Sequence, residues 1–107
     1  MDITILNIEL YTAGKEWNYK NVSNPYSRIY YITDGFATIQ HNQSIYELSP
    51  GNIYLIPCYS TINMFCPEQF THYYVHFTSR LQKGMDILSF FQCYYKASVN
   101  DLSAGPA

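Results

Sequence analysis

The sequence has few basic residues, and they are not clustered. Its six Lys and Arg side chains are spread along the chain, and the formal net charge is −2. Binding to nucleic-acid phosphates needs a basic patch or stripe. The segment is therefore not expected to bind DNA by itself.

Long apolar runs are also missing. No hydrophobic stretch reaches the roughly 18 residues that a membrane span needs. The first residues, MDITILNIEL, lack the basic and apolar parts of a secretory signal peptide. The three cysteines are an odd number without the compact spacing of a disulfide framework. These absences predict a cytoplasmic protein without membrane contact, in which Cys58, Cys66 and Cys93 are free thiols.

No catalytic motif is recognisable. The chain has no Gly-x-Ser-x-Gly, no glycine-rich phosphate loop and no pair of carboxylates in an apolar setting. Cys58, Cys66, His72 and His76 have the residue types of a zinc site, but His72 and His76 would lie about 13 Å apart on a strand and could not share one ion. We therefore predict no enzyme activity, no metal and no cofactor.

Aromatic residues are abundant instead: 12 Tyr and 6 Phe occur in 107 residues, against 13% charged residues. This composition is far from that of disordered chains, and the length suits one domain. Turn signals such as Asp34-Gly35 and Asn42-Gln43 separate short runs with strand propensity. These runs are Ile3–Tyr11, Arg28–Thr33, Phe36–His41, Ser44–Leu48, Ile53–Ile56, Thr61–Cys66 and Phe70–Thr78. They predict an antiparallel meander of about seven or eight strands that closes into a barrel or sandwich.

The periodicity changes after residue 80. Met85, Leu88, Phe91 and Tyr95 recur at intervals of three and four, which predicts a helix over about 83–96. The expected organisation is a barrel over 1–80, a helix within 81–97 and a tail or linker over 98–107.

Several positions resemble the cupin motifs. Gly35 matches the end of the first motif, and Gly51 and Pro57 match the start of the second. More narrowly, Leu48–Pro57 and Tyr74–Phe77 resemble the N-terminal sensor domain of AraC-type transcriptional regulators. The resemblance implies an all-β, cupin-type double-stranded barrel of jelly-roll type, followed by a C-terminal α-helix.

The cupin metal ligands are replaced. Arg28 stands at the position of the metal-binding Glu, Ile62 at that of a metal-binding His and Cys66 at that of the motif's Asn. A guanidinium cannot bind a cation, but it can hold an anion, a hydroxyl-rich ligand or a neighbouring carboxylate. The resemblance therefore implies a barrel without metal.

The AraC-type resemblance also implies a function. It predicts a small effector, most plausibly a sugar or related polar metabolite, inside the barrel, and a homodimer formed through the following helix. DNA would be bound only by a C-terminal helix-turn-helix domain that is absent from this chain. The predicted ligand-binding residues are Arg28, His72, Tyr74, Tyr30, Met64 and Ile62.

Alternatives stay open at this point. Arg28 could instead pair with Glu47, Asp34 or a backbone carbonyl. The chain could also be a stand-alone carbohydrate-binding module or a metal-independent cupin enzyme, and the latter would need two of Arg28, His72, His76 and Glu47 within hydrogen-bond reach.

Overall fold

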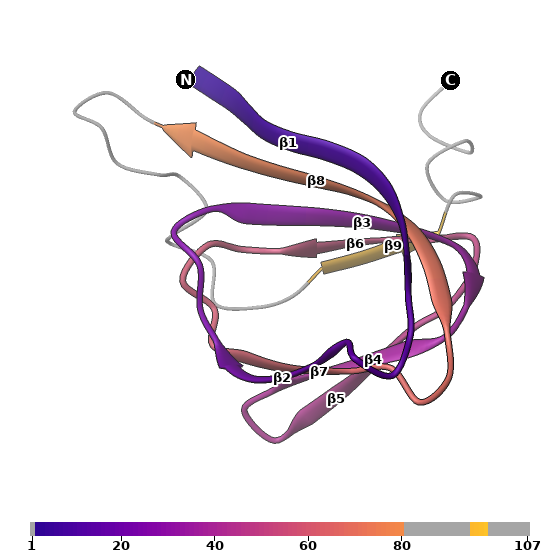
Figure 1. Cartoon of the computed structure of the whole chain (residues 1–107). Helices are drawn as coiled ribbons and strands as arrows, with labels where there is room; N and C mark the ends of the chain where they lie inside the picture. Colours follow the sequence, from indigo (N-terminus) through magenta and orange to yellow (C-terminus); the bar gives the residue numbers. More distant parts are fainter. Residues whose placement is uncertain (1, 81–94, 99–107) are drawn as a thin grey trace.

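The protein is a sandwich of two antiparallel β-sheets (Figure 1). A computed structural model describes residues 2–80 and 95–98. The strands are β1 (Asp2–Ala13), β2 (Asn18–Val22), β3 (Ser27–Gly35), β4 (Ala37–His41), β5 (Ser44–Leu48), β6 (Asn52–Ile56), β7 (Ile62–Phe65), β8 (Phe70–Arg80) and β9 (Tyr95–Ser98). One sheet has the order β1-β8-β3-β6-β9 and the other β2-β7-β4-β5. The predicted all-β, cupin-like class is confirmed.

The predicted meander is wrong. Strand β3 pairs with β6 and β8, whereas β4 pairs with β5 and β7 in the opposite sheet. Asp34 and Gly35 continue β3 and do not form a hairpin turn. Of the two predicted turns, only Asn42-Gln43 closes a hairpin, between β4 and β5.

Gly35 explains why the chain changes sheet at this point. Its φ of 79° lies in the left-handed region, and a Cβ there would lie 2.2 Å from the carbonyl oxygen of Gln69. Only glycine permits both the backbone angle and this close approach. The amide of Phe36 then donates to the same Gln69 carbonyl, which holds the crossing in place.

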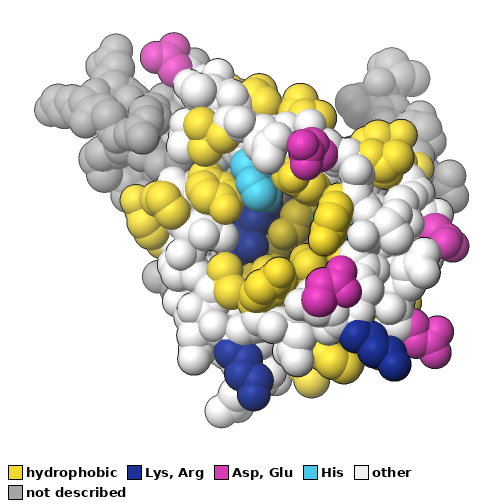
Figure 2. Space-filling view, viewed as in Figure 1, with side chains coloured by type: hydrophobic (Ala, Val, Ile, Leu, Met, Phe, Trp, Pro, Cys, Tyr) yellow, Lys and Arg dark blue, Asp and Glu magenta, His cyan; other side chains and the backbone are white. Residues whose placement is uncertain are grey.

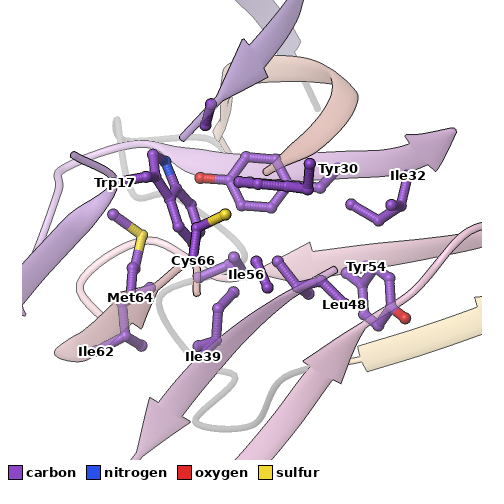
Figure 3. Close-up of a cluster of buried hydrophobic side chains, with 13 residues drawn as sticks. Trp17, Tyr30, Ile32, Ile39, Leu48, Tyr54, Ile56, Ile62, Met64 and Cys66 are labelled. Carbon is purple, nitrogen blue, oxygen red and sulfur yellow. The ribbon is translucent and has the colours of Figure 1, made fainter. Parts of the chain in front are cut away.

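The core lies between the two sheets. Alternating residues of β3, at Tyr30 and Ile32, and of β4, at Ala37 and Ile39, point inward, as the two-residue period of a strand requires. Figure 3 shows Trp17, Tyr30 and Met64 facing one another in this layer. Trp17 comes from the loop between β1 and β2, so this loop contributes a side chain to the core.

Strand β1 forms one edge of the larger sheet. Among the described strands it pairs only with β8, from Asp2 to Ala13, with one irregularity between Ile5 and Asn7. Its apolar side chains are exposed: Ile3, Ile5, Leu6, Ile8 and Leu10 are all more than half accessible.

The predicted helix lies mostly outside the described residues. Tyr95 and Lys96, its last two positions, belong to β9, which pairs with β6. No helix among residues 2–80 and 95–98 could span a membrane. Cys58 and Cys66 are buried and free, while Cys93 lies outside the described part.

Candidate ligand site

The face between the two sheets is hollowed. Figure 2 shows hydrophobic side chains around this hollow, with a histidine and a basic side chain inside it. The strands that supply the inner wall are β3 and β8, which run side by side through the larger sheet. Cross-strand pairs place Arg28 opposite His76, Tyr30 opposite Tyr74 and Ile32 opposite His72.

Arg28 is almost fully buried, with 3% of its surface exposed. Its Nη1 donates to the sulfur of Met64 in the facing sheet, at 3.6 Å. Its Nε has no hydrogen-bond partner. Asp34 and Glu47, proposed above as structural partners, are both exposed and neither bonds to it. Among the described residues the guanidinium therefore contacts the thioether of Met64 and the side chain of Tyr30, and no carboxylate.

His72 is equally buried and is surrounded by rings. It stacks in parallel on Phe70, with centroids 4.3 Å apart, and lies edge-on to Tyr30 at 5.0 Å. Its Nδ1 has no hydrogen-bond partner. Burial disfavours the charged ring and lowers the pKa of His72 from 6.5 to about 4. At neutral pH His72 is a neutral imidazole.

Tyr30 on β3 lies against His72, and Met64 on β7 in the facing sheet lies against Arg28. Burial raises the pKa of Tyr30, an effect that the nearby Arg28 guanidinium opposes. Met64 contacts Arg28 across the sandwich. Ile62 is also buried. It lies on β7 two residues before Met64 and belongs to the hydrophobic core.

Tyr74 is half-buried and hydrogen-bonded at the edge of the sheet. Its hydroxyl donates to Glu9 on β1 at 2.6 Å and accepts from Asn7 at 3.3 Å. Its ring lies between those of His72 and His76, at 5.9 and 4.7 Å. His72, Tyr74 and His76 thus lie on one face of β8, with His72 buried and the other two partly exposed.

Two nearby side chains were missed by sequence reasoning. Trp17 packs edge-on against Phe70 at 4.7 Å and lies 6.3 Å from His72. Tyr26 packs on His76 at 4.6 Å. Trp17 is the only tryptophan of the chain, and that rarity was the available signal. Lys20 on β2 is exposed and points to no part of this cluster.

The described residues contain no cluster of three or more His, Cys, Asp or Glu side chains that could hold a metal ion. Likewise, no two of Arg28, His72, His76 and Glu47 hydrogen-bond to one another in this part of the chain. The site therefore consists of one buried cation, neutral polar rings and apolar walls.

Comparisons with known proteins show the fold. No protein-family profile matches the chain, and no curated protein sequence matches it. The structure is similar to EutQ of Clostridium difficile, with a TM-score of 0.55 and 22% identity over 69% of this chain and 64% of that one. It also resembles NMB1881 of Neisseria meningitidis, with a TM-score of 0.55 and 8% identity over 70% of this chain and 81% of that one.

A third similar structure is ToxT of Vibrio cholerae bound to an unsaturated fatty acid. Its TM-score is 0.59 at 14% identity, over 94% of this chain and 44% of ToxT. The chain thus spans less than two thirds of EutQ and under half of ToxT. Its fold is cupin-like and resembles both EutQ and the N-terminal domain of the AraC-family protein ToxT.

Proposed function

We propose that this domain senses a small effector molecule in the hollow between its sheets, as the regulatory part of an AraC-type transcriptional regulator. The observation that carries the proposal is Arg28, which is buried among apolar side chains with an Nε that has no partner. A buried charge without a partner is costly, and such groups concentrate at binding sites. A bound effector would supply the missing partner.

The comparisons support this proposal. ToxT has the same kind of fold, and its structure holds an unsaturated fatty acid. The sequence itself contributes Leu48–Pro57 and Tyr74–Phe77, the two stretches that resemble AraC-type sensor domains.

The inward placement of the rings favours an internal site over a surface-binding module. Trp17, Tyr30 and Phe70 are buried between the sheets, whereas a carbohydrate-binding module would present such rings to solvent. In the proposed complex Arg28 and His72 contact polar groups of the effector and Tyr74 packs on its apolar face. A sugar, as the family resemblance implies, is one such effector.

We also propose that the domain is not an enzyme and works as a homodimer. The exposed apolar side chains of β1, such as Ile3, Ile8 and Leu10, would contribute to an interface between two copies. Light scattering after gel filtration measures the mass directly. A monomer at micromolar concentration would contradict this part of the proposal.

A thermal-shift screen of the whole chain tests effector binding. The compounds are mono- and oligosaccharides, carboxylates and common metabolites. Binding to the folded state raises the melting temperature. We expect at least one compound to stabilise the wild type and Lys20→Met, which removes an exposed cation, but not Arg28→Met. If no compound stabilises the protein, the proposal is contradicted.

A further inference from the structure

The charge balance around Arg28 narrows the class of effector. Every Asp and Glu side chain within residues 2–80 is exposed, and none of them bonds to Arg28. The acid on the inner face of β1, Glu9, is engaged by the Tyr74 hydroxyl. The described part of the protein therefore contains one buried positive charge and no counter-ion for it.

The neighbouring histidines do not add to this charge at neutral pH. Burial lowers the pKa of both His72 and His76, and the positive charge of Arg28 lowers that of His76 further. Each ring is then a neutral group with one N–H. One guanidinium with neutral neighbours carries a single positive charge. It therefore neutralises a ligand with one negative charge, whereas a ligand with two would keep one of them unbalanced.

The geometry of the guanidinium favours a carboxylate. Nη1 is turned toward the sulfur of Met64, while Nε remains without a partner. The N–H groups of a guanidinium form a planar fork that matches the two oxygens of a carboxylate. A second unpaired polar atom, Nδ1 of His72, is buried on the same inner face of β3 and β8.

The remaining walls are apolar. Trp17, Met64 and Ile56 are buried around the inner face, and the nearby polar side chains are few. A sugar needs a hydrogen-bond partner for each of its buried hydroxyl groups, because an unpaired one costs free energy. A ligand with one charged group and an apolar body can pack against these walls without burying unpaired hydroxyl groups.

We propose that the effector is a monocarboxylate with an apolar body, whose charge is bound by Arg28 and whose body lies against Trp17 and Met64. This inference rests on the function proposed above and names the class of ligand for the same site. It makes Arg28 the residue that distinguishes an acid from its neutral analogue.

Matched pairs of compounds test the inference. Octanoate and octanamide, and phenylacetate and phenylacetamide, differ at the carboxyl group while sharing the same body. Titration calorimetry on the whole chain gives their dissociation constants, with glucose and glucuronate as the saccharide pair. We expect an acid to bind at least tenfold more tightly than its amide, and Arg28→Met to remove this preference. Arg28→Lys keeps the charge without the fork and should bind acids with intermediate affinity.

The unfolding midpoint of the ligand-free variants gives an independent readout. Arg28→Met replaces a buried charge that has no counter-ion among the described residues with an apolar chain of similar length, so its midpoint should equal or exceed that of the wild type. A clearly lower midpoint would mean that Arg28 has a structural partner and would overturn the inference. Equal binding of acids and amides, or binding of glucose alone, would also overturn it while leaving the proposed function intact. If none of these compounds nor any in the thermal-shift screen binds, the proposed function fails as well.

Discussion

The hydroxyl of Tyr74 on β8 donates a hydrogen bond of 2.6 Å to the carboxylate of Glu9 on β1. The two residues are directly opposite in the antiparallel ladder. Because β1 is an edge strand with no second neighbour, this bond joins the edge of the sheet to the row of rings that ends at His72. The half-buried Tyr74 thus contributes to the site and to the attachment of β1.

Removing this hydroxyl should loosen β1. Tyr74→Phe keeps the ring and loses the bond, and we expect a loss of about 1 kcal/mol in the free energy of unfolding. Hydrogen exchange of β1 amides should accelerate near Glu9. If the double variant Tyr74→Phe, Glu9→Gln loses as much as the sum of the two single variants, the bond contributes nothing and the account of β1 is wrong.

The two glycines with positive φ should differ in their tolerance of alanine. At Gly35 a Cβ would lie 2.2 Å from a backbone oxygen, whereas at Gly51 nothing lies within 4 Å. Gly51→Ala adds only the strain of a left-handed backbone, about 1 kcal/mol. Gly35→Ala adds a clash and should cost several kcal/mol or prevent folding. Equal costs in urea denaturation would contradict the crossing described for Gly35.

Acid should destabilise the protein through His72. Its pKa falls from 6.5 to about 4 on folding, so between these values the unfolded chain binds a proton that the folded chain does not. Stability is therefore fully present above about pH 6.5 and decreases as the pH falls toward 4, by about 3 kcal/mol. His76 contributes in the same direction.

Substitutions isolate the contribution of His72 to this pH dependence. His72→Gln should flatten the dependence of the unfolding free energy on pH between 4 and 6.5. His41→Gln, on β4 in the other sheet, is the matched control for replacing an imidazole by an amide. An unchanged slope in His72→Gln would show that His72 is protonated equally in both states.

Trp17 provides a signal for ligand entry. It is the only tryptophan and lies among Tyr30, Phe70 and His72 in the core. A ligand that binds there should change the intensity or the wavelength of its fluorescence. Titration with the compounds found in the thermal-shift screen measures this change. A stabilising compound that leaves the emission unaltered would bind elsewhere.

Much of the fold could be predicted from the sequence because strand signals are local. Alternation and turn residues predicted strands near β1, β3, β4, β5, β6, β7 and β8. Sheet membership could not be predicted in this way. It depends on the contact between Gly35 and Gln69, 34 positions apart in the numbering, which no local pattern shows.

The ligand-binding role of the predicted site residues stays a prediction, but part of their placement followed from the sequence. Arg28 stood out because it replaces the metal-binding Glu of the cupin motif, and the structure shows that it is buried. Whether it had an acidic partner depended on the packing of the two sheets, which places Met64 next to it in the described structure. Trp17 was missed because it lies in a loop between polar residues, outside any periodic pattern.

The Nε–H resonance of Arg28 in ¹H–¹⁵N NMR spectra tests the central claim most directly. The assignment comes from comparison with Arg28→Lys, and the titrant is the carboxylate that binds most tightly in calorimetry. A new hydrogen bond to Nε should shift the resonance and slow its exchange with water, while the neutral amide should leave it nearly unchanged. If the carboxylate binds and the Arg28 Nε–H signal does not move, the effector is not held by Arg28 and the account of the site is contradicted.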